Sequence, residues 1–169
     1  YRVRLPDPTV LQPERVLAVG GREIRCAYVE LGEPGLPHLT VELPELAETT
    51  DDGLRALARA LRYHPALPKG ANVNFYTLTG KDAVLLRTYE RGVEDFTCAC
   101  GTGTGAVVSV LTLAGRVSGT AVRVKMRGGV LTMDVTARDG TARDLFLTGP
   151  ARLVARGEVF PEELLKNEI

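Results

Sequence analysis

The feature that most constrains this chain is an apolar segment that follows a run of glycines. Residues 106–114 read Ala-Val-Val-Ser-Val-Leu-Thr-Leu-Ala, and they come directly after Cys-Gly-Thr-Gly-Thr-Gly at 100–105. A helix with this composition is apolar on nearly every side, so it is stable only when protein surrounds it. It is also too short to cross a bilayer, which takes about 20 residues. The rest of the chain therefore has to wrap this helix.

Most of the remaining sequence alternates between apolar and polar residues, as β-strands do. Strands are expected at residues 1–5, 15–19, 22–31, 39–43, 73–78, 83–88, 122–126, 131–135 and 145–147, with a last one at 150–159. The glycine pairs at 20–21 and 128–129 are typical of tight hairpin turns. Strands and helices do not alternate in the way that builds a parallel doubly wound sheet. The sequence predicts an α+β fold in which antiparallel strands curl around one buried central helix.

Two further helices are expected outside this arrangement. In residues 51–62, apolar side chains recur at helical spacing, and the preceding Thr49 or Thr50 can cap the first turn. This pattern is typical of an amphipathic helix that lies on a sheet. A short terminal helix is expected at residues 161–166.

Length and charge limit the classes of protein to which the chain can belong. With 169 residues, 44% of them hydrophobic, residues 1–169 form a single domain with enough apolar content for a core. Basic and acidic residues are equal at 21 each, so nucleic acid is not an expected partner. No signal-peptide or membrane-spanning pattern is present, and three cysteines do not make a disulfide framework. We expect a cytoplasmic protein with free thiols.

Cys100 is the strongest candidate for chemistry because it stands where the buried helix begins. Unpaired amides at a helix N-terminus favour negative charge, so they are expected to lower the pKa of the thiol. The amides that follow, those of Gly101 and Thr102, can also hold a carboxylate. One structural device would thus activate an acid/base group and anchor an acidic substrate beside it.

Three other interpretations of this segment remain open on spacing alone. Cysteine is often buried, so Cys100 could serve only in packing. A strand, a glycine-rich turn and a helix also occur in nucleotide-binding proteins, but here the glycine spacing is wrong and no lysine follows. A metal site built from Cys98 and Cys100 has no second pair of ligands, and we expect no metal.

The whole stretch from Arg87 to Gly103 resembles the second active-site motif of diaminopimelate epimerases. It reads Arg-Thr-Tyr-Glu-Arg-Gly-Val-Glu, then a variable segment, then Ala-Cys-Gly-Thr-Gly. Pro37-His38 resembles that family's Asn-Pro-His loop, and residues 72–75 resemble its asparagine-bearing strand. Residues 149–151 resemble its closing strand, so the resemblance spans nearly the whole chain.

The resemblance implies an amino-acid epimerase that needs no cofactor and converts LL- to meso-diaminopimelate for lysine and peptidoglycan synthesis. In that family, two similar domains face each other, and each supplies one cysteine. This chain resembles the C-terminal half, and the Cys-Gly-Asn-Gly motif of the first half is absent from it. The implied partners are therefore an amino-acid substrate and the missing N-terminal domain, with self-association into a homodimer as a further expectation. The chain alone is expected to be inactive.

The resemblance also assigns roles to individual residues. Cys100 becomes the catalytic thiol, with Glu90 and His38 as polar partners that help to set protonation. Asn72 and Arg91 would grip the distal end of the substrate. The backbone amides of Gly101 and Thr102 would bind the α-carboxylate.

Three departures from the family's pattern keep a second function open. Leu36 stands where many members have asparagine, and Phe96 and Cys98 stand where a glutamate and usually a leucine are expected. Loss of a carboxylate from the rim of the site would alter substrate choice. The alternatives are therefore a related racemase or isomerase of the same fold, or a non-catalytic domain. Cys98 and Cys26 are both expected to serve in packing.

Overall fold

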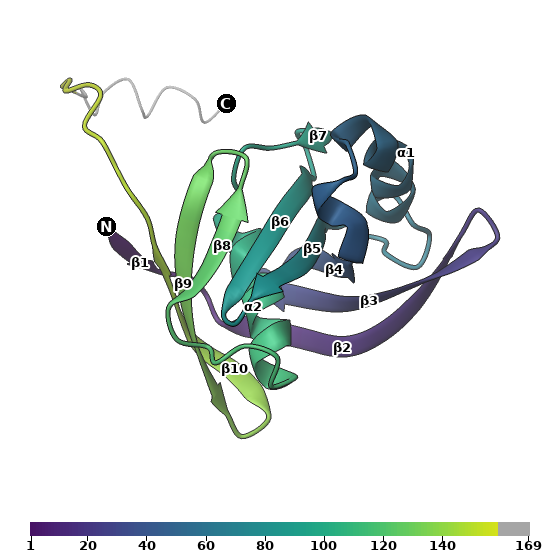
Figure 1. Ribbon diagram of the computed structural model, residues 1–169, viewed down its shortest axis with the longest axis horizontal. Coiled ribbons are helices and arrows are strands. Elements are labelled where there is room, and N and C mark those ends of the chain that lie inside the picture. Colours follow the sequence, from purple (N-terminus) through teal and green to yellow (C-terminus); the bar gives the residue numbers. More distant parts are fainter. Residues whose placement is uncertain (159–169) are drawn as a thin grey trace, which may run out of the picture.

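A single curled sheet forms most of the protein, and the computed structural model describes residues 1–158 of it (Figure 1). Its strands lie in the order β1-β10-β9-β8-β6-β5-β4-β3-β2, and the short β7 pairs with β6. The strands are β1 (Arg2–Arg4), β2 (Pro8–Val19), β3 (Arg22–Leu31), β4 (Leu36–Glu42), β5 (Asn72–Gly80), β6 (Ala83–Glu90), β7 (Asp95–Phe96), β8 (Val122–Met126), β9 (Gly129–Arg138) and β10 (Thr141–Thr148). The helices are the 3-10 turn η1 (Pro44–Ala47), α1 (Asp51–Arg62) and α2 (Gly101–Leu113). An α+β fold is confirmed.

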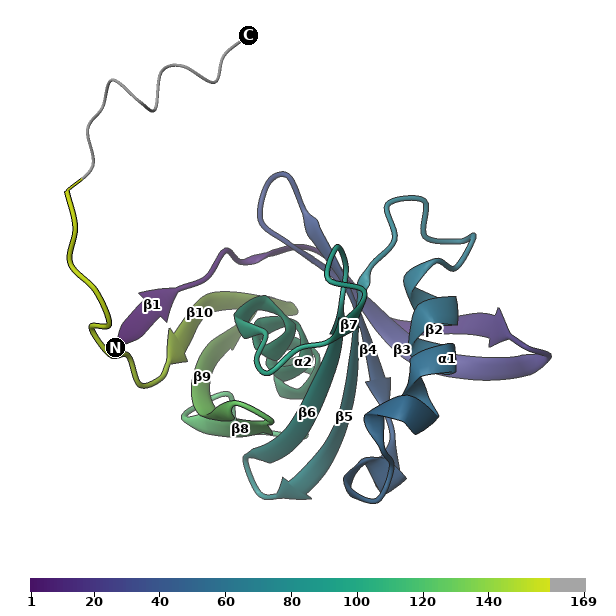
Figure 2. The ribbon, with the colours of Figure 1, turned by 90° about the horizontal axis from the view of Figure 1, so that it is seen from above.

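The sheet is mixed, so the prediction of antiparallel strands holds for most pairs of strands but not for two of them. Strand β4 pairs with β5 in parallel, and β6 pairs with β8 in parallel. In both cases the chain crosses from one strand to the next through a helix, α1 in the first crossing and α2 in the second. A parallel pair needs such a crossover, whereas a hairpin can join only antiparallel strands. The two crossovers place α1 and α2 on opposite faces of the curl (Figure 2).

Helix α2 lies inside the curl, against strands from both halves of the sheet (Figure 2). Every residue from Gly103 to Thr112 is buried. Its valines and leucines contact the inward-facing side chains of β3, β6, β8, β9 and β10 in one apolar cluster. Three buried hydroxyls on α2, those of Thr104, Ser109 and Thr112, depart from this apolar pattern, and that of Thr112 donates back to the Val108 carbonyl at 2.7 Å.

A second apolar cluster lies on the outer face of the sheet, under α1. Leu54, Ala58 and Leu61 of α1 are buried against the outward-facing side chains of β3, β4 and β5. The helix begins as predicted, because the Thr50 hydroxyl accepts the Gly53 amide at 3.1 Å. Strands β4 to β6 are thus covered by protein on both faces.

Residues 150–158 form no strand, contrary to the prediction. The last sheet contacts of this end are the paired backbone bonds between Tyr1 and Gly149, at 2.9 and 3.0 Å. Within residues 1–158 no further strand lies beside this segment, so its alternating apolar residues have nothing to pair with. Leu153 and Val154 are accordingly 84% and 91% exposed. The helix expected at 161–166 lies outside the described residues.

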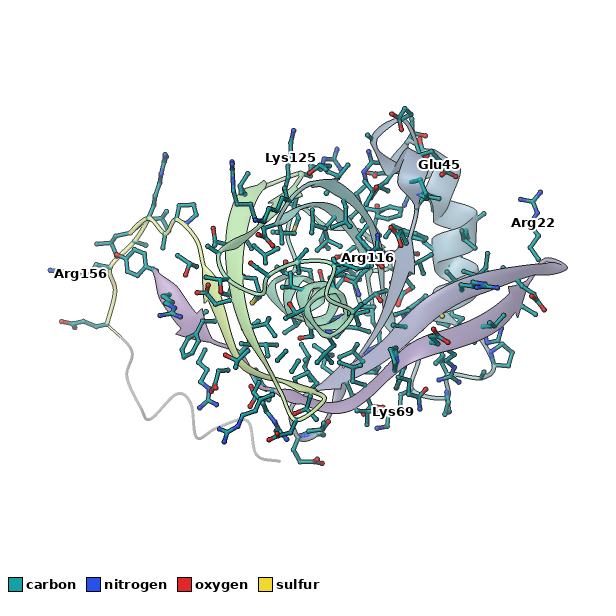
Figure 3. The ribbon with its side chains drawn as sticks, turned by 60° about the horizontal axis from the view of Figure 1, so that its bottom comes forward. Arg22, Glu45, Lys69, Arg116, Lys125 and Arg156 are labelled. Carbon is teal, nitrogen blue, oxygen red and sulfur yellow. The ribbon has the colours of Figure 1, made fainter. Side chains whose placement is uncertain are left out.

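Charged side chains lie mainly on the outside of the molecule. Figure 3 shows side chains filling the space between α2 and the strands, whereas the labelled Arg22 and Lys125 project outward. No helix within residues 1–158 is long and apolar enough to cross a membrane.

Burial of α2 predicts a large effect of truncating one of its side chains. Leu111 is 1% exposed in the cluster around α2, so Leu111→Ala should lower the free energy of unfolding by about 2–5 kcal/mol. Leu153→Ala makes the same chemical change at an exposed position and should stay within about 0.5 kcal/mol of the parent. Urea unfolding measures both, and equal effects of the two substitutions would contradict the enclosed position of α2.

Candidate functional site

Cys100 is the N-cap residue of α2. Its backbone is extended, and its sulfur accepts the Gly103 amide at 3.3 Å. Its carbonyl accepts both the amide and the hydroxyl of Thr104, at 3.0 and 2.9 Å. These contacts place the thiol directly over the first turn of a buried helix, where the sequence predicts it.

The expected lowering of the Cys100 pKa does not occur in this chain. Burial raises the pKa of the thiol, and the negative charge of Glu90 acts in the same direction. Hydrogen bonds from the Thr102 hydroxyl and the Gly103 amide lower it, but by less. The prediction considered only the amides, whereas loss of water around a residue that is 6% exposed has the larger effect. The thiol is therefore held protonated at neutral pH.

Polar side chains gather on the inner face of three strands, at the end of the curl where α2 begins. Along β5 and β6 the inward-facing residues are apolar at one end and polar at the other, and along β4 the buried inward-facing residues are His38 and Thr40. The register of these strands sets His38 beside Asn72, and Asn74 beside Thr88. The parallel pairing of β4 with β5 and the antiparallel pairing of β5 with β6 thus bring three strand ends together at one place.

Asn74 connects this polar group to α2. Its amide nitrogen donates to the Leu39 carbonyl at 2.8 Å and lies 3.3 Å from Nδ1 of His38. Its amide oxygen accepts the Thr88 hydroxyl at 2.9 Å. A Cβ added at Gly103 would lie 2.3 Å from that oxygen and 3.1 Å from the Cys100 sulfur. Glycine at 103 therefore lets the helix start approach this network closely.

Sequence reasoning did not assign roles to Asn74 and Thr88, although both are buried in this network. A signal was available, because Asn74 lies two residues after Asn72 and so faces the same side of the strand. The position of Thr88 beside it depends on the β5–β6 register, which the sequence does not display.

His38 is fully buried and neutral. Burial lowers its pKa from the ordinary 6.5 to about 3, and the positive charge of Arg91 adds to this effect. Within residues 1–158, Nε2 of the ring has no hydrogen-bond partner.

Asn72 and Arg91 lie next to each other, as their predicted shared role requires. The Asn72 side-chain oxygen accepts the backbone amide of Arg91 at 2.7 Å. The Arg91 guanidinium donates to the Lys69 carbonyl at 3.0 Å. Both groups are engaged within the chain, so their role in gripping a substrate stays a prediction.

The amides of Gly101 and Thr102 belong to the first turn of α2. The first four amides of a helix have no intrahelical acceptor, and here the Gly103 amide is directed at the Cys100 sulfur. Residues 101 and 102 are half-buried, in contrast to the enclosed turns that follow. Carboxylate binding by these amides stays a prediction.

Phe96 does not occupy the rim of this site. Its ring lies on the outer face of the sheet, 5.5 Å from the ring of Tyr89 and 6.3 Å from that of Phe75. The pairing of β7 with β6 sets Phe96 opposite Tyr89, and Tyr89 is buried in the cluster under α1. The replacement of a carboxylate by phenylalanine therefore adds to the outer core.

The two other cysteines differ from each other. Cys26 is buried in the outer cluster, as predicted, and burial raises its pKa to about 11. Cys98 is exposed, so the prediction that it serves in packing is wrong. It lies in the bend between β7 and α2, where its carbonyl accepts the Gly128 amide at 2.7 Å and its side chain lies outside both clusters. Residues 1–158 contain no group of three or more potential metal ligands.

Hollows elsewhere on the molecule lie away from Cys100. One, of about 590 Å³, is lined by Arg87, Lys125 and the start of α1. Another, of about 380 Å³, opens between β2, β3 and the middle of α2. Cys100 lines neither of these two hollows.

The close contact at Gly103 predicts that substitution by alanine destabilises the fold, whereas helix propensity alone would predict that it stabilises the fold. Alanine favours a helix over glycine by about 1 kcal/mol. At 103, however, the added Cβ would meet an amide oxygen held in place by the Thr88 hydroxyl. Gly103→Ala should therefore lower the free energy of unfolding by roughly 1–3 kcal/mol. Gly80→Ala, whose Cβ would lie at an ordinary 3.8 Å from Ala83, is the control and should change it by less than about 1 kcal/mol. An unchanged or raised stability of Gly103→Ala would contradict the close approach.

The low pKa of His38 predicts that acid destabilises the fold. The unfolded chain binds a proton on this ring near pH 6.5, whereas the folded chain does so only near 3. The stabilisation is therefore complete above pH 6.5 and is lost as the pH falls toward 3. Between pH 7 and 4.5 the loss should be roughly 2–3 kcal/mol, from about 1.4 kcal/mol per pH unit. Urea unfolding of the parent and of His38→Gln at both pH values isolates this contribution. An equal loss in both proteins would show that it does not come from His38.

Comparison with known proteins identifies the family. The family model of diaminopimelate epimerase matches residues 32–154. The diaminopimelate epimerase of Aquifex aeolicus (strain VF5) is 36% identical over 165 residues, which cover 96% of this chain and 56% of that protein. That of Chlorobaculum tepidum is 38% identical over 135 residues, 79% of this chain and 49% of its own length. The chain thus spans about half the length of the curated relatives that it matches.

A solved structure shares the fold. A probable proline racemase from Agrobacterium radiobacter K84 superposes with a TM-score of 0.61 at 17% identity, covering 86% of this chain and 49% of that one. This likeness concerns the fold alone. Since the family model covers well over half of the residues, this chain belongs to the diaminopimelate epimerase family.

Proposed function

We propose that this chain carries one half of the active site of a cofactor-independent epimerase that converts LL- to meso-diaminopimelate, in lysine and peptidoglycan synthesis. The observation that supports this most strongly is a thiol at the start of a buried helix, in a family whose matched relatives are diaminopimelate epimerases. The proposal has two levels: the reaction is the epimerisation of an amino acid, and the specific substrate is diaminopimelate.

The reaction requires two groups on opposite faces of the substrate. The α-hydrogen of an amino acid is a very weak acid, so the developing carbanion needs fixed dipoles in a site without water. One group removes the proton, and another delivers a proton to the opposite face. Cys100 is the group supplied by this chain, and a first domain supplies the other.

The raised pKa of Cys100 suits the delivering step. A protonated thiol can give its proton to the carbanion, and the thiolate formed is then stabilised by the amides at the start of α2. In the reverse direction the same sulfur removes the proton. The substrate carboxylate would bind the amides of Gly101 and Thr102, beside the sulfur.

The other predicted residues complete this half of the site. Glu90 is near enough to Cys100 for its charge to affect the thiol, which fits a role in setting protonation. Asn72 and Arg91 would bind the distal end of the substrate, where a guanidinium fork suits a carboxylate. His38 lies beside Asn72 and belongs to the same group.

The chain by itself would be an inactive half, because the second acid/base group would come from an N-terminal domain that covers the face on which Cys100 lies. Without that domain, two copies of the chain could associate through the face that it would cover. We propose a cytoplasmic enzyme whose partners are the amino-acid substrate and this first domain.

A racemase that acts on another amino acid is the alternative assignment. The fold shared with a probable proline racemase favours it. The main sequence argument for it is weakened, because Phe96 lies on the outer face of the sheet and not beside Cys100.

Exchange of the substrate α-hydrogen with deuterated water tests the proposal. The protein to use is the longest polypeptide encoded in frame with this chain, with LL-diaminopimelate and a panel of other amino acids including proline. Cys100→Ala should lower deuterium incorporation by at least about 100-fold, because general acid/base groups contribute that much or more.

Cys98→Ala is the matched control, because it removes an exposed thiol two residues away and should leave the rate within about twofold. Unchanged incorporation in Cys100→Ala would end the assignment of this thiol. Activity on another amino acid but not on diaminopimelate would favour the racemase. Turnover by residues 1–169 alone, at the rate of the longer polypeptide, would contradict the half-site.

A further inference from the structure

The hydrogen bonds around Asn74 determine which way its amide group points. The Leu39 carbonyl can only accept, so the group 2.8 Å from it must be the amide nitrogen of Asn74. The Asn74 oxygen then faces the Thr88 hydroxyl, which donates to it at 2.9 Å. A flipped amide would place two acceptors against each other at Leu39. The orientation therefore follows from chemistry and not only from atom labels.

This orientation determines the proton on His38. The second hydrogen of the Asn74 nitrogen points toward Nδ1 of the ring, 3.3 Å away. Nδ1 must accept that hydrogen, so it carries no proton of its own. A neutral imidazole then carries its proton on Nε2. Full burial and the nearby charge of Arg91 keep the ring neutral.

We propose that Asn74 is a positioning residue that holds His38 as the Nε2–H tautomer, so that His38 can donate a hydrogen bond but cannot act as a base. Both ring nitrogens are already committed: Nδ1 accepts from Asn74, and Nε2 bears the proton. No lone pair is left to remove a proton from a thiol or from a substrate.

The proposal gives the unpartnered Nε2 a function. Within residues 1–158 this buried atom has no acceptor, and a buried donor without a partner is unfavourable. An oxygen of an anionic amino acid bound at the start of α2 would supply the acceptor. This role rests on the proposed function, whereas the tautomer depends only on the structure of the chain.

The consequence for the reaction is that, of the thiol and the three side chains His38, Asn74 and Thr88, only Cys100 is in a state to exchange a proton at the α-carbon. His38 is a fixed donor, and Asn74 and Thr88 do not titrate. His38 therefore does not supply the second acid/base group that the proposed inversion needs.

Nitrogen NMR on the full chain tests the tautomer without any assay of activity. The sequence contains two histidines, so ¹⁵N-histidine labelling in a His64→Gln background leaves His38 as the single signal. We expect a protonated Nε2 and a bare Nδ1, with no change in their shifts between pH 5 and 8. A proton on Nδ1, or on both nitrogens in that range, would overturn the proposal.

Asn74→Asp separates positioning from a merely structural role. The carboxylate has the shape of the amide but can only accept, so the proton should move to Nδ1 of His38 or a second proton should be bound. Asn74→Leu is the comparison, because it removes the donor without adding an acceptor. A folded Asn74→Asp that keeps the parent's tautomer would contradict the role of Asn74. If that variant does not fold, the spectrum of the parent still decides the tautomer.

The donor role is tested in the longer polypeptide by deuterium exchange. Gln can donate a hydrogen bond but cannot act as a base, so His38→Gln should keep the rate within about tenfold. His38→Phe cannot donate a hydrogen bond, so its rate of deuterium exchange should fall by at least about 100-fold. Equal and severe losses in both variants would overturn the donor role, and they would leave the Cys100→Ala test of the proposed function unaffected.

Discussion

The structure depends on enclosing one helix that has no polar face. Helix α2 cannot be solvated along most of its length, so strands from both ends of the sheet have to surround it. The sheet curls for that reason, and its two parallel pairings follow from the helical crossovers that carry the chain. The first turn of α2 is the part that remains half-buried, and its free amides are not satisfied within the helix. The same constraint that builds the core therefore leaves one polar helix end at the surface of the domain.

Burial sets the protonation of Cys100 and of His38 at this end, and in both cases it favours the neutral form. The thiol of Cys100 is held protonated although hydrogen bonds at the helix start favour the thiolate. The imidazole of His38 is held neutral, at a pKa of about 3. In the proposed epimerase, a neutral thiol and a neutral hydrogen-bond donor would be suited to delivering a proton to a carbanion. That proposed reaction would also require a separate base, and the chain spans about half the length of its relatives.

Features that depend on neighbouring residues could be predicted from the sequence. The hairpin at Gly20-Gly21, the cap at Thr50 and the thiol at the start of α2 are local patterns, and the structure has all three. The resemblance to the family was also carried by a contiguous motif. The position of Phe96 could not be predicted, because its contact with Tyr89 on the neighbouring strand depends on the pairing of β7 with β6. The prediction that the pKa of Cys100 is lowered was wrong for a similar reason, since the burial that raises it comes from distant parts of the chain.

The most direct test of this account is the titration of the Cys100 thiol itself. In a Cys98→Ala chain, the rate of alkylation by iodoacetamide would be followed against pH, with peptide mass spectrometry separating Cys100 from Cys26. If burial outweighs the helix amides, the rate at Cys100 should reach half of its maximum above pH 9. A half-maximal rate below pH 8 would mean that the helix start stabilises the thiolate, and the protonated half-site described above would be wrong.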